Sequence, residues 1–100
     1  MPRIPVQLND ETSWAILDTG ATQNFIAKKF ATDWQPANMT VNLAAQRATI
    51  SIDGEAQMQI EVGGARQLVK FLVSNQLRED CVLGMSWFIE QQVTIDIPRR

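Results

Sequence analysis

Histidine is missing from this 100-residue chain, and cysteine occurs once, as Cys81. Without histidine, Ser-His-Asp and Cys-His catalysis as they are usually built are excluded. One cysteine cannot form an internal disulfide, and a zinc site needs more His or Cys ligands than this chain contains. Acid–base chemistry would therefore have to use carboxylates, lysines or water, and we expect no metal and no other cofactor.

Long apolar runs and an excess of positive charge are missing as well. No apolar stretch approaches the ~20 residues of a membrane span, and nine basic against eleven acidic residues leave a net charge of −2. We therefore expect neither a membrane nor nucleic acid as a partner. The N-terminus lacks the basic-then-apolar layout of a signal peptide, which favours an intracellular location over secretion.

The overall composition is that of a globular domain, with 45% hydrophobic and 20% charged residues. The length predicts one domain over residues 1–100. A chain of this size buries somewhat over ~60% of its unfolded surface, so its core is modest, and a subunit interface would add to it.

Apolar alternation with period two dominates the chain and predicts an all-β fold. The alternating runs are Ile4-Val6-Leu8, Val41-Leu43, Ile50-Ile52, Ala56-Met58-Ile60-Val62 and Val93-Ile95-Ile97. Turns are expected at Asn9-Asp10, Asp53-Gly54 and Gly63-Gly64. Helical turns are expected over residues 27–34 and, more clearly, over residues 85–91.

One acid stands inside the uncharged stretch AILDTGATQNF, residues 15–25. An ionised carboxylate costs several kcal/mol to bury unless partners hold it. Asp18 is therefore either a turn residue that reaches solvent or a carboxylate kept for chemistry. A second unit of apolar residues and glycine, Cys81-Val82-Leu83-Gly84-Met85, follows near the other end. Each of these two units is common in unrelated sequences. Their occurrence together, in this order and with alternating β segments between them, is much rarer.

These units identify a resemblance that extends from about Val6 to Ile97. The chain resembles retropepsins, the retroviral-type aspartic proteases, and most closely the proteases of gypsy-type LTR retrotransposons or a domesticated relative. The matching segments are Leu17-Asp18-Thr19-Gly20-Ala21, Asn24-Phe25-Ile26, Val41-Asn42-Leu43-Ala44, Asp53-Gly54 and Val82-Leu83-Gly84-Met85-Ser86-Trp87-Phe88.

The resemblance implies a retropepsin-type acid protease barrel with a flap hairpin and one short C-terminal helix, active as a homodimer. Each chain would lend one Asp18, and the two carboxylates would share a proton and activate a water that attacks the peptide carbonyl. The catalytic residues are then Asp18, Thr19 and Gly20. The expected activity is aspartic endopeptidase, with polyprotein processing as its role. The segment Leu83-Gly84 is expected to cross behind the Asp18 loop.

The resemblance also implies a peptide or polyprotein substrate that binds in an extended conformation under the flap. The expected substrate-binding residues are Ala21, Thr22, Gln23 and Leu83 and, at the flap tip, Ala44, Ala45, Gln46 and Arg47. The flap is expected over residues 41–60. Its tip departs from the family pattern because it contains no glycine, which predicts a stiffer or differently shaped flap.

A second hypothesis is a non-catalytic dimerisation or peptide-binding module with a retropepsin fold in a domesticated host protein. The intact Asp-Thr-Gly favours the protease, because a binding module does not need like charges at a crowded two-fold axis. The absence of glycine at the flap tip is the feature that favours the non-catalytic module as an alternative. In the family the two termini form an intersubunit sheet, so the runs at Ile4-Val6-Leu8 and Val93-Ile95-Ile97 are expected to pair between subunits.

Several other residues receive structural roles from the sequence. Phe25 and Ile26 are expected in the core, and Cys81 is expected to be a small buried hydrophobe. The three tryptophans are interpreted as core or interface anchors, and they are Trp14, Trp34 and Trp87. The acids Asp33, Asp80 and Asp96 are expected to be solvated or paired structural groups.

Overall fold

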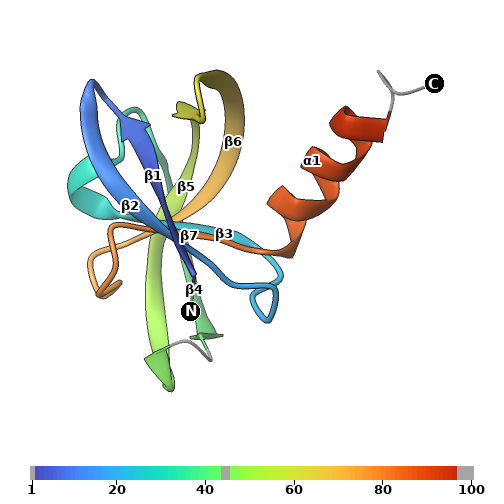
Figure 1. Ribbon diagram of the computed structural model, residues 1–100. Helices are drawn as coiled ribbons and strands as arrows, with labels where there is room; N and C mark the ends of the chain where they lie inside the picture. The colour runs from blue at the N-terminus through green and yellow to red at the C-terminus, as the bar shows by residue number, and fades with distance from the viewer. Residues whose placement is uncertain (1, 44–45, 97–100) are drawn as a thin grey trace.

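A computed structural model describes residues 2–43 and 46–96 of the chain (Figure 1). The elements in chain order are β1 (Arg3–Leu8), β2 (Glu11–Leu17), β3 (Asn24–Ala27), the 3-10 helix η1 (Lys28–Phe30), β4 (Gln35–Leu43), β5 (Ala48–Val62), β6 (Ala65–Ser74), β7 (Cys81–Leu83) and α1 (Met85–Asp96). The all-β prediction and the single C-terminal helix are confirmed.

The strands form a closed barrel with one hairpin extending from it. The strand order is β1-β2-β7-β3-β6-β5-β4, and an additional pairing of β1 with β5 closes the ring and leaves β4 outside it. β4 pairs with the first half of β5, and the pair Leu43–Ala48 is the last before the tip. This hairpin extends to one end of the barrel, as Figure 1 shows. It corresponds to the predicted flap but has other bounds than residues 41–60, because β4 already begins at Gln35 and β5 pairs with it only as far as Glu55.

Two of the predicted turns are confirmed. Asn9 and Asp10 join β1 to β2 with φ angles of 49° and 66°, a conformation that Asn and Asp adopt more readily than most residues. Gly63 and Gly64 join β5 to β6 with φ angles of 58° and 83°. Both connections have two residues, and such short turns fix the register of the strands they join.

The predicted turn at Asp53-Gly54 is wrong, because both residues lie inside β5. Gly54 pairs with Pro36 on one side and with Val73 on the other. A Cβ on Gly54 would lie 2.3 Å from the ring of Trp34 and 2.4 Å from the backbone oxygen of Gln35. The glycine therefore allows the chain entering β4 to pass close over β5 and does not bend the strand into a turn. The runs at Ile50-Ile52 and at Ala56-Met58-Ile60-Val62 consequently belong to one strand.

The predicted C-terminal strand is also wrong, since residues 93–96 continue α1, and Ile97 lies outside the described residues. Alternation over three apolar residues does not distinguish a strand from a helix, and a strand also needs a free edge to pair with. The other terminal strand, β1, pairs with β2 along its whole length and with β5 at Gln7 and Leu8. The second edge of β1 has no strand partner at residues 3–6 within the described chain, so the intersubunit pairing expected of the Ile4-Val6-Leu8 run stays a prediction. The other predicted helical segment, residues 27–34, is helical only at η1.

None of the alternating runs predicted β2, β3, β6 or β7. β3 is buried at every position and therefore shows no alternation, as expected for a strand covered on both faces. β6 contains Val69, Phe71 and Val73 at alternate buried positions, but Leu72 between them is buried as well. It follows that β6 alternates clearly only in its first half.

The interior is divided into two apolar clusters. One fills the barrel and includes the fully buried Leu8, Ile26 and Phe71. The other lies where the flap meets the barrel, and it includes Phe25, Leu43 and Ile50. The predictions that Phe25, Ile26 and Cys81 are buried are confirmed. Trp87 is buried and Trp34 is partly buried against the barrel, whereas Trp14 is 54% exposed and is no core anchor in this chain.

Candidate active site

Asp18 follows the last residue of β2, and its side chain is only 6% exposed. The backbone amide of Gly20 donates a hydrogen bond to Asp18 Oδ1 at 2.9 Å, and the amide of Ala21 donates to the Asp18 backbone oxygen at 3.1 Å. The buried Oδ2 atom has no hydrogen-bond partner in the described part of the chain. The Asp-Thr-Gly turn thus holds the carboxylate by one oxygen and leaves the other free to bind something else.

Gly20 lies close to the carboxylate that it binds. A Cβ at this position would lie 3.1 Å from Asp18 Oδ1, closer than ordinary van der Waals contact. A larger residue would push the carboxylate out of place or lengthen the amide hydrogen bond. The choice of glycine here therefore follows from the close approach of backbone and side chain.

The crossing behind the Asp18 loop is present as predicted. β7 runs parallel to β2 with Leu17 opposite Leu83, and the Asp18 amide donates to the Leu83 oxygen at 3.0 Å. A Cβ on Gly84 would lie 2.2 Å from the backbone oxygen of Gln23 and 2.7 Å from that of Ala21. Only glycine fits where these two backbones cross.

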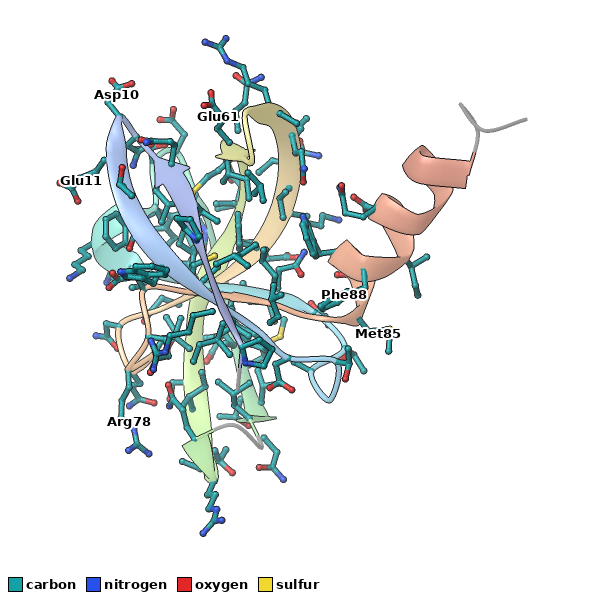
Figure 2. The ribbon with its side chains drawn as sticks, viewed as in Figure 1. Asp10, Glu11, Glu61, Arg78, Met85 and Phe88 are labelled. Atoms are coloured by element: carbon teal, nitrogen blue, oxygen red, sulfur yellow. The ribbon has the colours of Figure 1, made fainter. Side chains whose placement is uncertain are left out.

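The start of α1 fixes the far side of the loop. The Met85 amide donates to the Ala21 oxygen at 2.7 Å, and the Ser86 amide donates to the Thr22 oxygen at 3.2 Å. Figure 2 shows Met85 and Phe88 at this end of α1, next to the barrel. The loop that carries Asp18 is therefore held by β7 on one side and by the first turn of the helix on the other.

A cavity of about 520 Å³ lies between the flap and the barrel. Its lining residues come from β1, β2, the flap, the loop between β6 and β7, and β7, and they are Arg3, Ile16, Leu43, Gln46, Arg47, Arg78, Glu79 and Val82. Ile16 and Val82 are paired across β2 and β7. Ile16, two positions before Asp18, is the lining residue that lies nearest to it in the sequence, and Asp18 itself is not among the residues that line the cavity.

The flap tip is attached to the barrel of its own chain. The Arg78 amide donates to Gln46 Oε1 at 2.6 Å, and Arg78 Nη2 donates to the Gln46 backbone oxygen at 2.8 Å. Arg47 follows with a φ of 52°, in the region where other flaps would place glycine more readily. The absence of glycine at the tip is thus met by an arginine in the left-handed conformation and by two hydrogen bonds to the loop that contains Arg78.

The structure brings only some of the predicted substrate-binding residues together. Gln46 and Arg47 line the cavity, whereas Ala44 and Ala45 lie outside the described residues. Thr22 and Gln23 are exposed on the loop below Asp18, Ala21 is buried beside it, and Leu83 is fully buried in the barrel core. The neighbouring Val82 lines the cavity in place of Leu83.

The sequence reasoning missed the remaining lining residues. Ile16 could have been found, because alternation along β2 places it on the same face as Asp18. Arg78 and Glu79 could not, since they belong to a loop whose position over the barrel depends on how β6 and β7 pair with β3.

Two titratable residues, Asp80 and Cys81, lie outside the cavity and the Asp18 turn. Asp80 accepts a hydrogen bond from Ser13 and is 3.6 Å from Lys29 Nζ, so the prediction of a paired structural acid is confirmed for it. Burial raises the pKa of the Cys81 thiol from 9.0 to about 12, and the nearby Asp80 carboxylate adds to this effect.

Among the residues described, no group of His, Cys, Asp and Glu is arranged to hold a metal ion, and no helix is long and apolar enough to cross a membrane.

A closed barrel with a flap, and a buried aspartate in an Asp-Thr-Gly turn, together define a retropepsin-like aspartyl protease fold. A family model described as "gag-polyprotein putative aspartyl protease" matches residues 4–90, and the chain belongs to this family. No curated protein matches the chain.

The solved structures support the same fold. The retroviral protease-like domain of Ddi1 from Leishmania major superimposes with a TM-score of 0.67 and 17% sequence identity, covering 92% of this chain and 76% of that chain. At this identity, the likeness establishes the retropepsin-like fold and leaves the chemistry to be argued from the residues.

Proposed function

We propose that this chain is an aspartic endopeptidase that works as a homodimer, with one Asp18 from each subunit in a shared site. The observation that carries this proposal is the Asp18 carboxylate, which is buried and held through Oδ1 by the Gly20 amide, while Oδ2 has no partner in the described chain. A buried carboxylate with an unsatisfied oxygen is costly unless something binds it. A water and a second carboxylate across a two-fold axis would meet this need.

In the proposed reaction, two Asp18 carboxylates share one proton, because two like charges in contact cannot both ionise. The ionised carboxylate takes a proton from the bound water as its oxygen attacks the carbonyl carbon of the peptide. The protonated carboxylate donates its proton to the developing oxyanion. As the resulting tetrahedral intermediate collapses, one of its two hydroxyl groups returns a proton to the dyad, the C–N bond breaks, and the amine leaves with the proton that the dyad took from the water. The family description supports a polyprotein as the natural substrate.

The dimer follows from the single Asp-Thr-Gly in the chain. Thr19 is exposed next to the buried carboxylate, and the proposal expects it to contact a second copy of the same loop. Activity should therefore depend on dimer population, which rises with protein concentration by mass action.

The test is cleavage of a fluorescence-quenched peptide library between pH 4 and pH 7, with and without pepstatin. Asp18→Asn should abolish cleavage without changing the fold, because an amide cannot take the proton from water. Asp33→Asn is the matched control, since Asp33 is exposed and has a φ of 51°, which asparagine also tolerates. Activity that survives in Asp18→Asn, or a rate strictly first order in protein down to nanomolar concentration, would contradict the proposal.

One observation favours the second candidate, a peptide-binding module without catalysis. The flap tip is held to its own barrel by the two Gln46–Arg78 hydrogen bonds, whereas a protease flap has to open and close for each substrate. Peptide binding by a dimer that never cleaves, at any pH tested, would support this module in place of the enzyme.

A further inference from the structure

The cavity between the flap and the barrel combines an apolar floor with a charged rim. Its floor is formed by Ile16, Leu43 and Val82, which are at most 7% exposed. The rim carries Arg3, Arg47, Arg78 and Glu79. Three arginines against one glutamate give the rim an excess of positive charge, although the chain as a whole has a net charge of −2.

The single negative group of the rim is already paired. Arg3 Nη1 lies 2.7 Å from Glu79 Oε1, and the Glu79 side chain is 28% exposed. In this ion pair the charges of Glu79 and Arg3 compensate each other. Arg78 and Arg47 therefore supply the excess positive charge of the rim.

The two remaining arginines differ in what they bind. Arg78 Nη2 donates to the backbone oxygen of Gln46, a neutral acceptor that leaves the charge uncompensated. Arg47 makes no ion pair with any residue of the described chain. Figure 2 shows Arg78 on the loop at the flap side of the barrel, while Glu61 and Asp10 lie toward the opposite end.

We infer that this cavity selects an acidic side chain of the substrate, glutamate above its isostere glutamine. The methylene groups of a glutamate would lie over the apolar floor, and its carboxylate would reach the guanidinium groups of Arg47 and Arg78. Arginine is suited to this role because its planar group binds carboxylates through two parallel hydrogen bonds. This inference rests on the proposed function, since it names the substrate class of the same site.

The experiment compares two pools of quenched decapeptides at pH 5.5 and low salt, where a free glutamate is ionised. The pools are randomised, and one carries Glu and the other Gln at a single fixed position, which is moved along the peptide. At one position we expect kcat/KM to favour Glu by about 2- to 5-fold, the range of a solvent-accessible ion pair. Added salt should reduce this ratio.

Two rim variants should move the ratio in opposite directions. Arg47→Gln removes a positive charge and should bring the Glu/Gln ratio towards one. Glu79→Gln removes the negative charge and should increase the ratio. A residue with a merely structural role would change both rates together and leave the ratio unchanged. Arg66→Gln is the matched control, because Arg66 lies near the start of β6 and pairs with Glu61, 3.8 Å away, outside this cavity.

The same peptide pairs, labelled with fluorescein, are titrated onto Asp18→Asn to separate this inference from the proposed function. Tighter binding of the Glu peptide supports the acidic preference even if the native chain cleaves nothing, a result that would reject only the proteolysis. Cleavage without a Glu preference at any position overturns the inference and leaves the protease proposal standing. Equal binding of both peptides, or no binding up to millimolar concentration, overturns it as well.

Discussion

The side-chain oxygen of Asn24 accepts a hydrogen bond from the buried backbone amide of Gly84 at 2.8 Å. The same side chain donates from Nδ2 to the backbone oxygen of Lys70 at 3.2 Å. One buried amide group thereby joins β6 to the junction of β7 and α1, the segment that supports the Asp18 loop from behind. The Asn24-Phe25-Ile26 segment of the sequence thus contributes both a core strand and a polar cross-link.

Asn24→Ala should lower the free energy of unfolding by about 1–3 kcal/mol, because it leaves the buried Gly84 amide without its acceptor. Urea denaturation followed by tryptophan fluorescence measures this loss. Asn42→Ala is the control, since Asn42 is exposed on β4 and should change stability by less than about 0.5 kcal/mol. Equal effects of the two substitutions would show that the Asn24 cross-link does not support the loop.

Gly84→Ala should destabilise the chain by about 3 kcal/mol or more, since the new methyl group would overlap the backbone oxygens of Gln23 and Ala21. Thermal unfolding by circular dichroism provides the measurement. The comparison is Gly63→Asn, at a φ of 58° with nothing within 4 Å of an added Cβ, where asparagine should be tolerated. A normal melting transition for Gly84→Ala would refute the proposed close crossing of the two backbones.

The Cys81 thiol should make stability fall at alkaline pH. Burial raises its pKa to about 12 in the folded chain, from an ordinary value of 9.0. Between these values the unfolded chain loses the proton while the folded chain keeps it, so the folded state binds more protons and is disfavoured as pH rises. The contribution of this group is complete below pH 9 and declines by up to about 1.4 kcal/mol for each pH unit above it.

Urea titrations between pH 8 and pH 10.5, on the native chain and on Cys81→Ala, measure this dependence. The variant loses some packing at every pH, but the fall in stability above pH 9 should become shallower in it. Parallel curves for the two proteins would show that the thiol ionises equally in the folded and unfolded states.

Gln46→Ala should loosen the flap, because it removes the acceptor of the Arg78 amide at the tip. Loss of one such hydrogen bond corresponds to about 3- to 10-fold faster opening, which hydrogen exchange at the amides of residues 48–52 can report. Gln57→Ala, on an exposed position of β5 beyond the flap, is the control. Unchanged exchange in Gln46→Ala would mean that strand pairing alone holds the flap down.

The sequence alone predicted an all-β fold and singled out Asp18, but it left open whether the Asp18 carboxylate reaches solvent. Period-two alternation, two short turns and the units around Asp18 and Gly84 are local signals, and each reports directly on a strand, a turn or a close backbone approach. The prediction that Leu83-Gly84 crosses behind Asp18 came from the family resemblance, and the contacts of Gly84 confirm it. The roles of Thr19, Thr22 and Gln23 toward a partner subunit or substrate stay predictions.

Tertiary structure decided what local patterns leave ambiguous. Asp53-Gly54 has the composition of a turn, yet it continues β5, because pairing with both neighbouring strands and the passage of Trp34 over Gly54 stabilise the extended chain there. Residues 93–96 alternate like a strand, yet they extend α1. The charged rim of the cavity joins Arg3, Arg47 and Arg78 from three distant segments. Their proximity depends on strand order and barrel closure, which arise from long-range pairing that no local stretch of sequence encodes.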